Sequence, residues 1–139
     1  MTPDHDIAFL PLAWDELQAF LARERSKINR DIDQDVRFMT YAMYCEQRVE
    51  GLHLNGELVG FARWDLRNRH LSNLYVMPEA RGHGIARRYM QERKFTTLYV
   101  IPTNEAAKRL YNSLGFIKQT CAVPSREFMV HMSQLVATT

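Results

Sequence analysis

The order of strand-like and helix-like segments predicts a mixed α/β or α+β protein with a largely antiparallel sheet. Two observations carry this prediction. Short β-type runs flank an Asn55-Gly56 pair, which is typical of a tight antiparallel hairpin. Further along, a strand, a helix and a second strand follow one another across residues 76–102. The connection at 78–95 is long enough for a right-handed crossover between parallel neighbours, so one strand pair is expected to be parallel.

Size and composition favour a single globular domain over residues 1–139. The chain has 139 residues, of which 46% are hydrophobic and 24% charged, and this is ordinary for a globular protein. A formal charge of +2 tolerates an anionic ligand but does not indicate a nucleic-acid partner. No apolar run is long enough to cross a membrane, and the N-terminus has no secretory pattern. We therefore expect a cytoplasmic protein without a membrane partner, in which Cys45 and Cys121 are reduced thiols.

The N-terminal part of the chain predicts one strand and two helices. A strand-like run at 7–12 ends in a proline region, and the apolar spacing then changes to that of a helix with an acidic first turn. The polar stretch 26–34 is interpreted as a linker. Asp33 or Asp35 would cap a second helix. The apolar faces are Trp14, Leu17, Phe20 and Leu21 in the first helix, and Val36, Met39, Ala42 and Met43 in the second.

The rest of the chain is mainly β-type. Residues 49–54 and 58–64 flank Asn55-Gly56, the pair preferred in a type I′ turn because both positions need positive φ. Beyond this hairpin we expect strands at 71–76 and 96–101, a helix up to about Lys94, a helix at 104–114 with Gly115 at its C′ position, and a closing antiparallel pair at 116–123 and 127–132 around Pro124-Ser125.

A glycine-rich loop joins the strand at 71–76 to the following helix. Gly82 and Gly84 stand where backbone N–H groups are unpaired and the helix dipole is positive, so the loop suits a phosphate. Arg81 adds charge at its mouth. The alternative is a simple strand-to-helix turn. The loop has neither the third glycine of a dinucleotide fingerprint nor the Gly-Lys-Ser/Thr ending of a nucleoside-triphosphate loop.

Two patterns resemble a known family when they are taken together. Val76-x-Pro78-x-x-Arg81-Gly82-x-Gly84-x-Ala86 is similar to the central acetyl-CoA signature of the GCN5-related N-acetyltransferases (GNAT). Further along, Asn104-x-x-Ala107-x-x-x-Tyr111-x-x-x-Gly115-Phe116 resembles the second signature of that family. The resemblance covers residues 58–116 well. It implies a twisted, mostly antiparallel mixed sheet with helices on both faces and a central parallel pair that brackets acetyl-CoA.

The resemblance also implies an activity, a cosubstrate and roles for single residues. An amine acceptor would attack the thioester of acetyl-CoA directly, without a covalent enzyme intermediate. The backbone of Val76 would bind the pantetheine arm and polarise the thioester carbonyl, and Asn104 would lie beside the cofactor. Tyr111 would protonate the departing thiolate. The pyrophosphate would be held by Arg81, Gly82, His83, Gly84, Ile85 and Ala86.

Some choices stay open at this point. Tyr111 also fits a core aromatic, and the general base could be Asp65, His70, Ser72 or a chain of waters. The acceptor is not identified by any motif. A non-catalytic sensor or protein-binding module that keeps the coenzyme pocket is the alternative to an enzyme.

The helix after the glycine loop is shorter than the family usually has. Only 23 positions separate Arg81 from Asn104, so this helix shrinks to about three turns. A sheet face that is left partly bare would favour association, and we therefore expect a homodimer.

Overall fold

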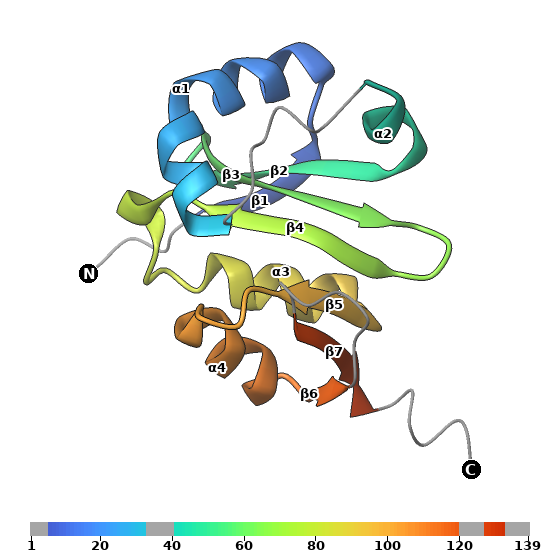
Figure 1. Cartoon of the computed structure of the whole chain (residues 1–139). Helices are drawn as coiled ribbons and strands as arrows, with labels where there is room; N and C mark the ends of the chain where they lie inside the picture. The colour runs from blue at the N-terminus through green and yellow to red at the C-terminus, as the bar shows by residue number, and fades with distance from the viewer. Residues whose placement is uncertain (1–5, 33–40, 120–126, 133–139) are drawn as a thin grey trace.

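A single twisted sheet organises the described part of the chain (Figure 1). The computed structural model describes residues 6–32, 41–119 and 127–132. Within them the sheet has seven strands in the order β1-β2-β3-β4-β5-β7-β6. Only the β4–β5 pair is parallel; every other neighbouring pair is antiparallel. The strands are β1 (Ile7–Pro11), β2 (Arg48–Leu54), β3 (Glu57–Asp65), β4 (His70–Val76), β5 (Thr97–Val100), β6 (Phe116–Gln119) and β7 (Glu127–His131).

Helices cover both faces of the sheet. Figure 1 shows α1 (Trp14–Ile32) and α2 (Tyr41–Glu46) on one side, and α3 (Ile85–Arg93) and α4 (Glu105–Ser113) on the other. A short 3-10 turn, η2 (Pro78–Ala80), follows β4. Each face has its own apolar cluster, one built under α1 and the other under α3 and α4. The predicted fold class is thus confirmed. No helix in the described ranges is both long and apolar enough to span a membrane.

The hairpin between β2 and β3 forms as the sequence predicts. Asn55 and Gly56 both have positive φ, at 53° and 83°, which is the backbone that a type I′ turn requires. The crossover between β4 and β5 is also present, with α3 as its helix. These local signals therefore identified the two connections that define the sheet.

The prediction of a linker at 26–34 is wrong for the residues that the structure describes. Helix α1 continues to Ile32 and has 19 residues. The apolar stripe of the helix extends to Ile28, which is fully buried against the sheet. Ile28 continues the amphipathic spacing of the helix, with Arg25 and Ser26 exposed beside it. The predicted caps Asp33 and Asp35, the apolar residues Val36 and Met39, Cys121 and the turn at 124–125 lie outside the described residues.

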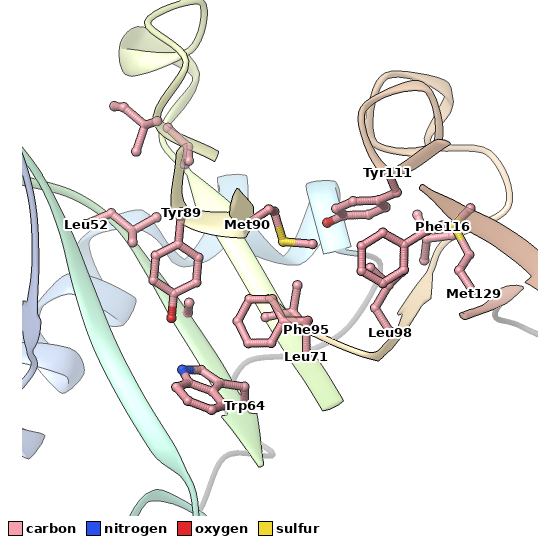
Figure 2. Packing of buried hydrophobic residues seen from close by; sticks show 14 of the residues in the cluster. Leu52, Trp64, Leu71, Tyr89, Met90, Phe95, Leu98, Tyr111, Phe116 and Met129 are labelled. Carbon is pink, nitrogen blue, oxygen red and sulfur yellow. The ribbon is translucent and has the colours of Figure 1, made fainter. Parts of the chain in front are cut away.

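The short helix α3 is fastened to the sheet by a buried carboxylate. Glu50 of β2 accepts hydrogen bonds from the Tyr89 hydroxyl at 2.7 Å and from the Trp64 indole N–H at 3.2 Å. In Figure 2 both donor atoms face the same space between α3 and the sheet. Arg93, the last residue of α3, adds a bidentate ion pair to Glu50 with two 2.8 Å bonds. Both the middle and the end of this nine-residue helix are therefore tied to β2.

Candidate functional site

The strands β4 and β5 pair over a short distance and then separate. Their parallel ladder joins only His70 to Thr97 and Leu71 to Leu98. Beyond it, toward the C-terminal ends of both strands, lies a cleft of about 760 Å³. Its walls come from β4, the glycine loop, the segment after β5 and α4. The lining residues are Leu74, Tyr75, Val76, Arg81, Gly82, Ala86, Ile101, Thr103, Asn104, Ala106, Ala107, Leu110 and Tyr111.

The peptide groups of Val76 point into this gap. Met77 N donates to Val59 O at 2.7 Å, which makes Met77 and Val59 a hydrogen-bonded pair of the β3–β4 ladder. Residues of an antiparallel strand face the partner strand alternately. The next pair, Val76 and Gly60, therefore directs the N–H and C=O of Val76 away from β3, toward β5. Since β5 has already diverged from β4, a ligand in the cleft can use both groups.

Arg81 reaches back across the cleft to one of these groups. Its Nε donates to the carbonyl oxygen of Val76 at 2.9 Å, and its guanidinium carbon lies 5.7 Å from the centre of the Tyr75 ring. The Arg81 side chain thus binds the carbonyl that, by the family resemblance, would bind the pantetheine arm. A ligand that binds this carbonyl either shares it with Arg81 or replaces the Arg81 side chain there.

The glycine loop has the backbone that an anion site needs. Gly82 and Gly84 have φ of 90° and 75°, a region that favours glycine. A Cβ at either position would meet nothing within 4 Å. The first hydrogen bond of α3 runs from Arg88 N to Gly84 O at 3.0 Å. The N–H groups of the residues before Arg88 therefore have no acceptor inside the helix, and the positive end of the helix dipole adds to their attraction for phosphate.

The other predicted loop residues contribute in different ways. The His83 side chain bonds to its own loop, with Nδ1 2.9 Å from Ala80 O. Ile85 is buried in the core beneath α3. Ala86 lines the cleft. A smaller hollow of about 210 Å³ lies directly at the loop, with Arg87 on its rim. The loop is thus built from backbone and small side chains, with Arg81 and Arg87 as its nearby charges.

Asn104 lines the far wall of the cleft and caps helix α4. Its side-chain oxygen accepts a hydrogen bond from Ala107 N at 3.1 Å. This is the usual arrangement for an asparagine at a helix start. The Asn104 side chain thus caps α4, and the residue also lines the cleft.

Tyr111 packs in the core and also lines the cleft. It is only 7% exposed, packs edge-on against Phe116 with ring centres 6.2 Å apart, and still lines the cleft. Figure 2 shows its hydroxyl pointing toward Met90 of α3. Burial raises the pKa of Tyr111 to about 12, so the hydroxyl keeps its proton at neutral pH. Such a group can donate a proton but cannot act as a base there.

Two of the predicted candidates for the general base lie at the wrong end of β4. His70 and Asp65 face each other across the β3–β4 ladder beside the hairpin loop. Val76 is six positions along the extended strand from His70, which is about 20 Å. The His70 ring lies 2.7 Å from the Thr97 hydroxyl, and burial lowers the pKa of His70. Ser72 is half-buried in the middle of the strand.

One residue that shapes the site was missed in the sequence. A Cβ on Gly60 would lie 2.1 Å from the carbonyl oxygen of Tyr75. Gly60 therefore allows β3 to approach β4 at the pair that includes Val76. The signal was present, because a glycine inside a β-type run often marks a close approach of two backbones.

Comparison with known proteins identifies the family. The family model described as an acetyltransferase (GNAT) domain matches residues 41–118, which is more than half of the chain. The chain belongs to the GNAT acetyltransferase family. The resemblance noted in the two sequence signatures is thereby confirmed. A comparison with curated protein sequences finds no match.

Solved GNAT structures share the fold at low sequence identity. An acetyltransferase from Thermus thermophilus has a TM-score of 0.68 at 20% identity, and the match covers 90% of this chain and 96% of that one. PaiA N-acetyltransferase from Thermoplasma acidophilum, in complex with coenzyme A, has a TM-score of 0.64 at 16% identity, with coverage of 91% and 98%. Arabidopsis thaliana Naa50, in complex with the bisubstrate analogue CoA-Ac-MVNAL, has a TM-score of 0.65 at 18% identity, with coverage of 89% and 96%. At these identities the likeness shows the fold.

Proposed function

We propose that this GNAT protein transfers an acetyl group from acetyl-CoA to an amine acceptor by direct attack on the thioester. The observation that carries the proposal is the gap between β4 and β5, into which Val76 directs its N–H and C=O. A donor aimed at a thioester carbonyl stabilises the negative charge that develops on its oxygen during attack. The N–H of Val76 is in the right place for this task.

The walls of the cleft fit the other parts of the coenzyme. The pyrophosphate would lie on the glycine loop at the start of α3, where backbone N–H groups and Arg81 attract it. The pantetheine arm would run along β4 and take over the Val76 carbonyl from Arg81. Arg81 would then turn toward the phosphates. Structures of GNAT relatives with coenzyme A or a bisubstrate analogue support this choice of cosubstrate.

Tyr111 would give its proton to the coenzyme sulfur as the carbon–sulfur bond breaks. Its pKa is raised to about 12 by burial, so it is protonated whenever the thiolate needs a proton. Tyr111 is one of the residues that line the cleft. No serine or cysteine nucleophile is required for a direct transfer.

Two measurements test the proposal. Coenzyme A and acetyl-CoA should both raise the melting temperature, because a ligand that binds only the folded state stabilises it. Desulfo-CoA should act nearly as well, since the phosphates supply most of the contacts. Thiol release from acetyl-CoA across a panel of amines, with mass spectrometry of the products, should then reveal one acetyl group on an acceptor.

The outcomes separate three possibilities. Acetylated product supports the proposed enzyme. Stabilisation by coenzyme A without acetylation of any amine would indicate the alternative, a coenzyme-binding sensor. Stabilisation by NADH or ATP but not by coenzyme A would contradict the proposed cosubstrate.

A further inference from the structure

Two arginines that neither sequence signature specifies lie beside the coenzyme cleft. Arg87 directly follows the glycine loop and lines the small hollow at that loop. Arg109 is on α4, one turn before Ser113. A hydrogen bond of 3.0 Å from Arg87 Nη2 to Ser113 Oγ joins α3 to α4, and Figure 1 shows these two helices on the same side of the sheet. Since residues four positions apart on a helix are neighbours, both guanidinium groups lie near Ser113.

No carboxylate in the described part of the chain neutralises these two cations. The side-chain partner of Arg87 there is the uncharged hydroxyl of Ser113, and Arg109 has no acidic partner among the same residues. The adjacent Arg88, by contrast, forms an ion pair with Glu92 at 3.4 Å. A guanidinium carries five N–H donors in a planar fork that matches a phosphate. Arg87 and Arg109 therefore keep both charge and donors for an anionic ligand.

The surface between the arginines and the cleft is apolar. Ala106 and Leu110 share a face of α4 with Arg109 and Ser113, because residues three or four positions apart point the same way. Both of these apolar residues line the cleft, and Leu110 also lines the hollow at the glycine loop. A ligand that extends from the loop across α4 would first meet this apolar surface and then the positive charge at its edge.

The distance from the glycine loop indicates which part of the coenzyme meets the arginines. Arg87 is three residues after Gly84, which is about 4.5 Å along a helix axis. In coenzyme A, the ribose next to the pyrophosphate carries a separate phosphate monoester at its 3′ position. This monoester has close to two negative charges at neutral pH, since its second pKa is about 6. A pyrophosphate on the loop thus brings a second, more highly charged phosphate within reach of a long arginine side chain one turn away.

We propose that Arg87 and Arg109 bind the 3′-phosphate of coenzyme A, with Arg87 as the main contact; this inference rests on acetyl-CoA being the cosubstrate in the proposed function. The site then selects thioesters of coenzyme A over thioesters of carriers that lack this phosphate. Before binding, the Ser113 hydroxyl holds the Arg87 side chain beside α4. On binding, the phosphate replaces this neutral partner with a charged one.

The test compares coenzyme A with dephospho-CoA, which lacks only the 3′-phosphate. In titration calorimetry of the wild type, the Kd for dephospho-CoA should be roughly tenfold higher than the Kd for coenzyme A, as the loss of a charge-assisted hydrogen bond predicts. Arg87→Ala should weaken the binding of coenzyme A by about this factor and leave the binding of dephospho-CoA unchanged. The ratio of the two Kd values should therefore fall toward one. Arg109→Ala should lower the ratio less.

Arg88→Ala is the matched control, because it removes the same charge one residue away, from a side chain that pairs with Glu92. This variant should keep the wild-type ratio of Kd values. Arg87→Lys retains the charge without the planar fork and should recover part of the ratio. The side chains of Arg87, Arg88 and Arg109 are all exposed, so the urea unfolding midpoint of each variant should stay close to that of the wild type.

Two results would overturn the inference. One is a wild-type protein that binds coenzyme A and dephospho-CoA equally well. The other is a ratio that Arg87→Ala and Arg88→Ala lower by the same factor, which would be an effect of net charge and not of a contact. Either result leaves acetyl transfer to an amine intact as the proposed function. A wild-type protein that binds neither coenzyme would instead reject the proposed cosubstrate, and this inference with it.

Discussion

Tyr111 is buried in the core and also lines the cleft, and Tyr111→Phe removes only its hydroxyl. The ring stays, so packing against Phe116 should survive. Loss of a positioned general acid lowers turnover by roughly 10²–10⁴, and the lower part of this range is expected because a thiolate leaves readily. The KM for acetyl-CoA should change little, which identifies an effect on the transition state. Kinetics of both proteins from pH 6 to 10 provide the measurement.

The burial of Tyr111 determines how the rates of wild type and Tyr111→Phe depend on pH. A pKa of about 12 keeps the Tyr111 hydroxyl protonated over the whole range of the assay. The wild-type rate should therefore show no alkaline decline caused by Tyr111, and the ratio of the two rates should stay constant. Tyr99→Phe is the control, since Tyr99 is 41% exposed and is not part of the cleft wall. Equal kcat for wild type and Tyr111→Phe would make Tyr111 a core residue only.

A substitution at Gly84 tests whether the glycine loop binds the phosphates of coenzyme A. Gly84→Val puts a branched side chain at φ 75°, where it is strained, and into space that is open without a ligand. A phosphate needs that space, so affinity for coenzyme A should fall at least about tenfold, or 1.4 kcal/mol. Gly56→Val is a matched control, because Gly56 has φ 83° and also faces open space, but in a hairpin turn. Titration calorimetry should find weak binding in the first variant and normal binding in the second.

The candidate residues were predictable to different degrees. The glycine spacing and the second signature led to the residues that line the cleft, because both patterns are local in sequence. The close approach at Gly60 had a local signal, a glycine inside a β-type run, that was overlooked. The contact between Arg81 and Val76 depends on how the loop folds back onto β4, and no local pattern encodes it.

Among the elements, α3 owes its position to Glu50. Burial works against the charge of this carboxylate, but the hydrogen bonds it accepts outweigh that penalty and hold its pKa below the usual value. Glu50→Gln removes the ion pair with Arg93 and should lower the free energy of unfolding by about 2 kcal/mol at neutral pH. Since Glu50 and α3 contact the same core as the cleft, affinity for coenzyme A should fall with stability.

The lowered pKa of Glu50 determines how the stability of the protein changes in acid. The stabilisation is complete above the pKa of an unfolded glutamate, about 4.3, and disappears as the pH falls through the lower value in the folded protein. Urea unfolding from pH 7 to pH 3 should therefore show a difference between wild type and Glu50→Gln that shrinks below about pH 4. Glu57→Gln, at the exposed start of β3, should behave as wild type. A constant difference at every pH would contradict this account.

The helices show where periodicity is informative and where it fails. The strands and the hairpin carry strong local signals, and the structure has them within a residue or two of the predicted bounds, apart from the strand expected at 116–123, whose residues 120–123 lie outside the described residues. In α1 the residues from 26 onward are mostly polar and resemble a linker, yet Ile28 places a buried face against the sheet there. Only the sheet beneath identifies that face, and for this reason the length of α1 could not be obtained from the sequence.

At the scale of the whole molecule, one sheet separates two apolar clusters. Both clusters include residues of β3 and β4, so neither half of the described chain has a core of its own. We therefore propose that residues 1–139 form one domain. The cleft between β4 and β5 is lined by residues of β4, the glycine loop and α4, so segments far apart in the sequence contribute to it.

The short α3 leaves a hollow that we expect a second copy of the chain to cover. The helix ends at Arg93, and Lys94 turns the chain away with φ 54°. Beyond this end lies a hollow of about 370 Å³, whose apolar lining includes Phe95, Leu114 and Phe116. Apolar patches of this kind commonly mark association surfaces. Sedimentation should therefore show a homodimer at micromolar concentration.

A substitution in the lining of this hollow tests whether the predicted homodimer forms through it. Gln91 is exposed on α3 and lines the hollow, so Gln91→Glu would bring a charge into an apolar contact without disturbing the monomer. A charge without a partner in a buried interface costs several kcal/mol, which is enough to move a micromolar dimer to the monomer. Gln18→Glu, exposed on α1, should leave the dimer intact. A wild-type monomer at high micromolar concentration, or a dimer that Gln91→Glu does not weaken, would show that α3 is short for a reason other than association through this hollow.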